Sequence, residues 1–166
     1  MSIRLFYDRW PQYNRRLVET LRGLDAEQLA LRAQPEHWPV WAIAGHLAGS
    51  RVYWLCHILG EPGGDATPFA DPTTEGWEDD LDHPRTAGEL VDALESSFAV
   101  IEGILDRWTP EDLSVEFERR YGDERQVHSR TSVLQRVLTH EAYHDGEIAL
   151  ALGAHHLDPV YIWRPY

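Results

Sequence analysis

Residues 131–152, TSVLQRVLTHEAYHDGEIALAL, form a long stretch with helical periodicity near the end of this 166-residue chain. Its apolar residues recur at spacings of three and four, the pattern of one face of an α-helix. His140 and His144 fall on that same face. The face consists of Val133, Val137, His140, His144, Ile148 and Ala151. Unpaired imidazoles are costly in an apolar interior. The stretch therefore predicts a core-facing helix whose two histidines bind a common partner.

Three further segments carry an apolar stripe of the same period, at residues 3–24, 39–59 and 86–108. Residues 60–85 are rich in Gly, Pro, Asp and Thr, and predict a long irregular connection between the second and third helices. Four long amphipathic helices with short links elsewhere predict an all-α fold, a four-helix bundle. We expect residues 1–166 to form it as a single domain.

Local signals set the expected ends of these helices. Pro39 suits the first position of a helix, and Thr86, with a glutamate three residues later, predicts a capping box. Pro11 either kinks the first helix or restarts it. Gly153 is expected to end the last one. The polar residues 115–130 alternate only weakly, which leaves open either a hairpin or an irregular excursion.

Composition limits the partners that the chain can bind. It carries 28 acidic and 15 basic residues, a formal net charge of −13, and no lysine. Nucleic-acid surfaces and anionic membranes need clustered cations, so we expect neither partner. No stretch reads as a signal peptide or a bilayer span, and the single cysteine, Cys56, cannot form an internal disulfide. These features predict a cytoplasmic protein in which Cys56 is a packing residue.

The paired histidines favour a metal site if a third ligand exists. Residues four apart on a helix stack on one face, so His140 and His144 can converge on one ion. The best third ligand is His46 in WAIAGHLAGSRVYW (residues 41–54), which lies beside the apolar stripe of the second helix. Three imidazoles would leave coordination positions open for water or substrate. A core histidine bonded to a carbonyl remains the alternative for His46.

The letters HEAYH also match the zinc-protease motif, in which Glu141 would act as the general base beside the metal. Only 22 residues follow His144, which leaves little room for the usual third ligand of such enzymes. No upstream sheet is predicted that could hold an extended peptide. The protease is therefore the weaker interpretation of this motif.

Helical spacing names candidates for orienting the ligands or the substrate. Tyr53 lies seven residues after His46, and Glu147 three after His144, so we predict both as supporting catalytic residues. Ser50 and Tyr143 share these faces, although packing between helices is the simpler role for both tyrosines. Two arginines, Arg51 and Arg136, could receive an acidic substrate. Surface ion pairs with the many carboxylates are the simpler use of both.

Two sequence motifs resemble those of the DinB-like, or YfiT-like, metalloenzyme superfamily. HWPVWAIAGHLAGSRVYWL (37–55) has a tryptophan eight residues before a histidine, and LQRVLTHEAYHDGEIALALG (134–153) contains His-x-x-x-His-x-Gly-Glu. The resemblance implies a four-helix bundle that tends to dimerise, with metal ligands His46, His140 and His144. This chain departs from the common pattern at Pro39, Ala42 and Asp145, none of which is an implied ligand.

The resemblance also implies a class of chemistry. Members with an assigned activity are largely thiol-dependent, using bacillithiol, mycothiol or glutathione as a cosubstrate. The expected function is therefore a metal-dependent S-transferase acting on a small molecule, with zinc, nickel or iron as the divalent ion. A metal-dependent hydrolase is one alternative. The other is a non-catalytic binding or dimerisation module that presents the aromatic tail, residues 158–166, to a partner.

Overall fold

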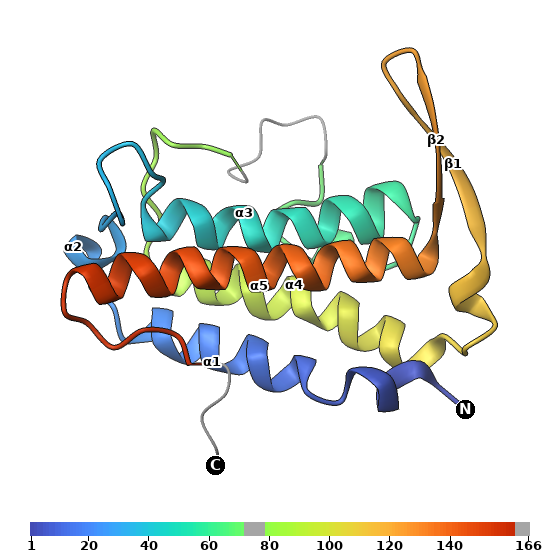
Figure 1. Ribbon diagram of the computed structural model, residues 1–166, viewed down its shortest axis with the longest axis horizontal. Helices are drawn as coiled ribbons and strands as arrows, with labels where there is room; N and C mark the ends of the chain where they lie inside the picture. The colour runs from blue at the N-terminus through green and yellow to red at the C-terminus, as the bar shows by residue number, and fades with distance from the viewer. Residues whose placement is uncertain (72–78, 162–166) are drawn as a thin grey trace.

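The computed structural model describes residues 1–71 and 79–161, and these residues are mostly helical (Figure 1). The α-helices are α1 (Trp10–Arg22), α2 (Ala26–Leu29), α3 (Val40–Val52), α4 (Ala87–Arg107) and α5 (Arg130–Ala154). Single turns of other helix types occur at Ile3–Tyr7, Tyr53–Ile58, Gly64–Ala66 and Asp112–Ser114. One antiparallel hairpin joins β1 (Glu116–Tyr121) to β2 (Glu124–Ser129). Parts of the predicted 60–85 connection and of the aromatic tail lie outside the described residues.

The expected first helix is divided into two. A 3-10 turn spans Ile3–Tyr7, and α1 starts again at Trp10 with Pro11 in its first turn. Proline is tolerated there because the first backbone N–H groups of a helix have no partner in any case. Of the two expectations for Pro11, the restart is confirmed.

Helix α3 also differs from the prediction at both ends. Pro39 occupies the N-cap with an extended backbone (ψ 155°) instead of the first helical position. Beyond Val52 the chain continues as a π-helical turn, Tyr53–Ile58, in which the wider hydrogen-bonding pattern shifts the register of the side chains. Side chains after Val52 therefore do not follow the face that a regular α-helix would give them.

The predicted capping box is present at the start of α4. The Thr86 hydroxyl accepts from the backbone N–H of Glu89, and the carboxylate of Glu89 accepts from the backbone N–H of Thr86. The end of α5 was predicted wrongly. This helix continues through Gly153 to Ala154, and the left-handed residue is His156, with φ at 60°. Of the two expectations for residues 115–130, the hairpin is confirmed, with Gly122 at positive φ in its turn.

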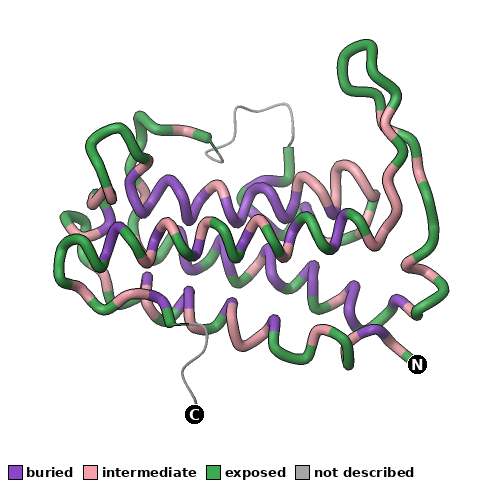
Figure 2. The backbone as a smooth tube through the Cα atoms, viewed as in Figure 1, coloured by how far each residue is buried: buried purple, intermediate pink, exposed green. Residues whose placement is uncertain are grey.

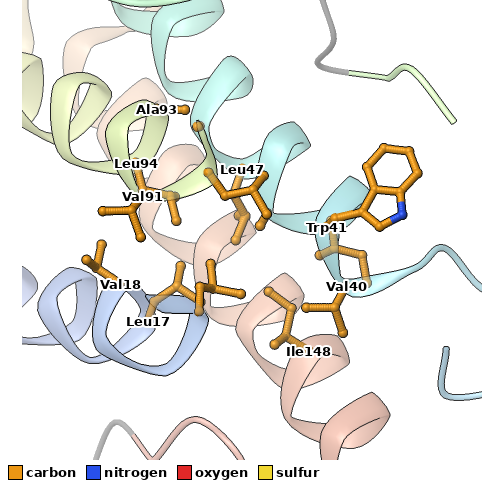
Figure 3. Packing of buried hydrophobic residues seen from close by; sticks show 14 of the residues in the cluster. Leu17, Val18, Val40, Trp41, Leu47, Val91, Ala93, Leu94 and Ile148 are labelled. Carbon is orange, nitrogen blue, oxygen red and sulfur yellow. The ribbon is translucent and has the colours of Figure 1, made fainter. Parts of the chain in front are cut away.

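The long helices lie alongside one another, with α3 packed on both α4 and α5, and α1 packed on α4 (Figure 1). Every residue of α3 except His46 is buried, which makes this helix the centre of the core (Figure 2). Leu17 of α1, Leu47 of α3 and Leu94 of α4 meet within one apolar cluster (Figure 3). Within the described residues, no helix is both long and apolar enough to cross a bilayer.

Candidate metal centre

Three histidines from two neighbouring helices converge at one point. His46 comes from α3, and His140 and His144 come from α5, where a spacing of four places them on one face. The Nε2 atom of His140 lies 2.9 Å from that of His46 and 3.1 Å from that of His144. The three potential ligand atoms all lie within 4.8 Å of one another. The sequence prediction of which histidines meet is therefore confirmed.

The other ring nitrogen of each histidine has a partner of its own. The Nδ1 atom of His46 lies 2.8 Å from Oδ1 of Asp79, and that of His144 lies 2.5 Å from Oε2 of Glu147. The Nδ1 atom of His140 lies 3.3 Å from the hydroxyl of Ser50. A histidine that binds a metal through one nitrogen usually donates from the other in this way, which fixes the orientation of the ring.

These partners decide where the ring protons are. An ionised carboxylate can only accept, so Asp79 and Glu147 require an N–H at Nδ1. The hydroxyl of Ser50 donates its proton to the carbonyl of Leu47, at 3.1 Å, and so it too accepts from the histidine beside it. The neutral rings of His140 and His144 therefore direct their Nε2 lone pairs at the point where Nε2 of His46 also lies. A cation bound at this point would satisfy these lone pairs.

The charge state of the rings suits the same ion. Burial lowers the pKa of His140 to about 4, and the neighbouring charges of His144, His46 and Arg136 act in the same direction. Burial also lowers the pKa of His144, against the opposing effect of Glu147. Both rings are thus neutral at pH 7 and able to bind a metal. Tetrahedral coordination at roughly 2.0–2.1 Å separates ligand nitrogens by about 3.3 Å, close to the spacing seen here.

Aromatic rings and an apolar cavity lie beside the histidines. The ring of Trp38 meets that of His46 edge-on at 5.5 Å, and the ring of Tyr143 meets that of His144 at 5.0 Å. A cavity of about 210 Å³ is lined by Trp38, Ile43, Tyr143, Glu147 and Ala151, among others. An apolar group of a small molecule could therefore lie next to the ligand cluster.

Comparison with known proteins places this geometry in a family. The sequence model of the DinB superfamily matches residues 12–148 of the chain. The chain belongs to the DinB superfamily. A crystal structure of a DinB-like protein from Bacillus cereus ATCC 10987 superposes with a TM-score of 0.66 at 19% identity, covering 99% of this chain and 98% of the other. A conserved protein from Enterococcus faecalis gives 0.66 at 18% identity, covering 92% and 99%. No functionally curated protein matches in sequence.

The supporting residues expected in this DinB protein are divided between two locations. The carboxylate of Glu147 lies beside His144 and the hydroxyl of Ser50 lies beside His140, and their supporting role stays a prediction. Tyr53 is directed elsewhere, since its hydroxyl accepts from Nη2 of Arg119 in β1 at 2.6 Å. Asp79 was missed by sequence reasoning. It follows an irregular connection, and no spacing pattern links such a residue to a helix far away in sequence.

The expectation that Arg51 forms a surface ion pair is wrong. Its side chain is fully buried, and its Nε donates to Oε1 of Glu141 at 2.7 Å. The other carboxylate oxygen of Glu141 accepts from Nε1 of Trp10, also at 2.7 Å. Glu141 thus lies in the core between α1 and α3, and is not available to the histidines as a general base. This contradicts the protease interpretation of HEAYH.

Next to this ion pair, Asp145 gives the DinB protein a pH-dependent stability. Burial raises the pKa of Asp145 to about 7; the charge of Glu141 also raises it, and that of Arg51 lowers it. An unperturbed aspartate titrates at 3.8. Between these values the folded chain binds more protons than the unfolded chain, so stability falls as the pH rises through this range.

We expect Asp145→Asn to remove this fall. Between pH 5 and pH 7, metal-free parent protein should lose on the order of 2 kcal/mol more unfolding free energy than the variant. Urea denaturation at both pH values, with a chelator present, measures the difference. Asp92→Asn, on the exposed side of α4, is the matched control and should keep the parental pH dependence. Parallel pH profiles for parent and Asp145→Asn would contradict the prediction.

Proposed function

We propose that this DinB protein is a metal-dependent enzyme that binds one divalent ion through His46, His140 and His144 and transfers a small thiol to an electrophile. One observation carries the proposal: the Nε2 atoms of three histidines converge, while each Nδ1 atom lies within hydrogen-bonding distance of a partner, Asp79, Ser50 or Glu147. A divalent ion would satisfy the three converging nitrogens. Zinc, nickel and ferrous iron all suit three imidazoles.

The site leaves room for a cosubstrate. Structural zinc sites are closed by four protein ligands, whereas catalytic sites keep a position for water or substrate. Within the described residues, the three histidines are the only group of His, Cys, Asp or Glu side chains close enough together to hold an ion. A bound divalent ion would supply positive charge that lowers the pKa of a coordinated thiol.

The chain itself offers no thiol for this chemistry. Its single cysteine, Cys56, is half-buried, and burial raises the pKa of its thiol, so the reactive thiolate is disfavoured. The sulfur must therefore come from a low-molecular-weight cosubstrate. In the proposed step the thiol loses its proton to solvent, and sulfur forms a bond to the electrophilic carbon. The bond from that carbon to its leaving group, or to an epoxide oxygen, breaks, and the leaving atom keeps the electron pair.

The proposal includes two expectations about architecture. The four long helices α1, α3, α4 and α5 are taken to form the four-helix bundle expected from the sequence. The chain is also expected to form a homodimer, which sedimentation velocity can test. Neither expectation is needed for the chemistry, because all three histidines belong to one chain.

Thiol transfer can be tested with a chromogenic electrophile. Protein loaded with zinc, nickel or ferrous iron is mixed with 1-chloro-2,4-dinitrobenzene and either bacillithiol, mycothiol or glutathione at pH 7. A thiol with pKa near 8.5 is only about 3% ionised at this pH, so complete ionisation raises the rate up to about 30-fold. We expect at least a tenfold rate excess over the His140→Ala/His144→Ala variant. A loaded protein that accelerates no thiol would reject the S-transferase and favour the non-catalytic module.

A further inference from the structure

Two arginines from different elements contact one tryptophan ring near the end of α5 that joins the hairpin. The guanidinium of Arg136, from α5, lies 4.4 Å from the centre of the Trp54 ring, and that of Arg119, from β1, lies 5.0 Å from it. Arg119 also contacts the rings of Tyr53 and Tyr121, at 5.5 and 5.2 Å. Its hydrogen bond to the hydroxyl of Tyr53 fixes it further.

The charges of this pair are not neutralised within the chain. In the described part of the protein, neither Arg119 nor Arg136 forms an ion pair, although the chain carries 28 acidic residues. Many other arginines do have a carboxylate partner, namely Arg4, Arg22, Arg51, Arg85, Arg107, Arg125 and Arg130. Cation–π contacts hold the two guanidinium groups in place and, apart from the Nη2 donor that Arg119 gives to Tyr53, leave N–H groups that can bind an anion.

This arginine pair lies beside the histidine cluster. Arg136 precedes His140 by four residues on α5, which places it one turn away on the same face. On the opposite wall, Ser50 contacts His140, and Tyr53 and Trp54 follow it within about one turn. One helical turn rises about 5.4 Å. A small molecule can therefore reach both the histidines and the arginines at once.

From this juxtaposition we propose that Arg119 and Arg136 bind the anionic group of the thiol or electrophile. This subsite rests on the proposed function, since it positions a ligand at the same metal centre. Guanidinium groups bind carboxylate and phosphate through paired N–H donors, so the ligand class is a small oxyanion-bearing molecule. Its charged group lies a few covalent bonds from its reacting atom. The hairpin has a role here, because Arg119 of β1 donates to Tyr53, which directly follows α3. The hairpin itself lies at one end of the long helices (Figure 1).

The subsite is tested with two thiols of similar size and different charge. Isothermal titration calorimetry compares 3-mercaptopropionate, which carries a carboxylate, with neutral 2-mercaptoethanol on the zinc-loaded full chain. We expect the carboxylate probe to bind about tenfold more tightly. Arg119→Gln and Arg136→Gln should each reduce that preference to about twofold or less, and Arg136→Lys should restore part of it. Arg120→Gln, which removes the same charge from the next residue of β1, should leave it unchanged.

Competition by inorganic phosphate identifies the oxyanion. Displacement of 3-mercaptopropionate by phosphate supports the subsite with a phosphate-bearing ligand, and failure to displace it supports a carboxylate. The same pair of thiols is titrated into His140→Ala/His144→Ala. Arginine-dependent preference in that variant keeps the subsite even if the metal proposal fails. Equal affinity for both thiols in the parent, or a preference unaffected by both glutamine variants, would overturn the subsite whatever the metal content.

Discussion

Replacing Arg51 with methionine is expected to lower the free energy of unfolding by about 3–5 kcal/mol. The guanidinium is fully buried between α3 and α5, where it donates to Glu141, to the carbonyl of Leu94 and to the hydroxyl of Ser97. Methionine fills much of the same volume but leaves the Glu141 carboxylate in the core without its cation. Isolated buried charge is among the most destabilising features that a single substitution can create.

The size of this effect depends on burial, which a control can show. The ion pair of Arg22 with Glu95 has a similar contact distance, 2.8 Å, but both side chains are more than half exposed. Arg22→Met should therefore cost at most about 1 kcal/mol. Urea denaturation of the parent and both variants makes the comparison. Equal losses at Arg51 and Arg22 would contradict the assignment of the first pair to the core.

A double variant separates loss of the pair from loss of packing. In Arg51→Met/Glu141→Gln the charge is removed from both partners, while a carbonyl oxygen remains to accept from Trp10. We expect this variant to recover more than half of the stability lost in Arg51→Met, because replacing both charges of a buried pair is often close to neutral. A double variant less stable than the single one would place the cost in packing instead.

The second large effect concerns metal binding itself. Protein purified without a histidine tag should bind about one equivalent of zinc by equilibrium dialysis, and His140→Ala or His144→Ala should weaken that binding about 10³-fold. The estimate takes one of three ligands as contributing roughly a third of a binding free energy of about 12 kcal/mol. Elemental analysis of the dialysed protein measures the stoichiometry.

Two further variants distinguish the histidine cluster from its supporting residue and from a histidine outside it. Glu147→Gln leaves all three imidazoles in place but weakens the hydrogen bond to His144, so we expect a loss of about 10–100-fold. His83→Ala removes an exposed histidine that pairs with Asp80, outside the cluster, and should leave zinc affinity unchanged. Full metal content in the His140→Ala/His144→Ala protein would show that these histidines do not bind the metal.

Two walls of different chemistry flank the histidines. On one side lies the apolar cavity at Trp38 and Tyr143, and on the other lie Arg119 and Arg136 over Trp54. Such a site suits a ligand with one apolar and one anionic end, held so that its middle reaches the three histidines. The ring contacts that already hold Arg119 and Arg136 over Trp54 would reduce the loss of side-chain freedom on binding.

The sequence by itself determined most of the helical segments of this DinB protein and the three histidines that meet between α3 and α5. Helical periodicity is a property of neighbouring residues, so the stripe containing His140 and His144 and the capping box at Thr86 could be predicted without knowing what packs against them. His46 could be found because its helix is apolar on nearly every side, and a polar imidazole in such a helix is costly unless it has a bonding partner.

Only the tertiary structure decided which distant groups contact those histidines and their neighbours. Asp79 reaches His46 from an irregular connection, Glu141 meets Arg51 across 90 residues of sequence, and Arg119 of the hairpin meets Trp54. Such contacts follow from the packing of whole elements against one another, and the local sequence around a charged residue does not show whether that residue faces solvent or a buried partner. Local sequence pattern therefore identified the three histidines, and long-range packing determined their surroundings.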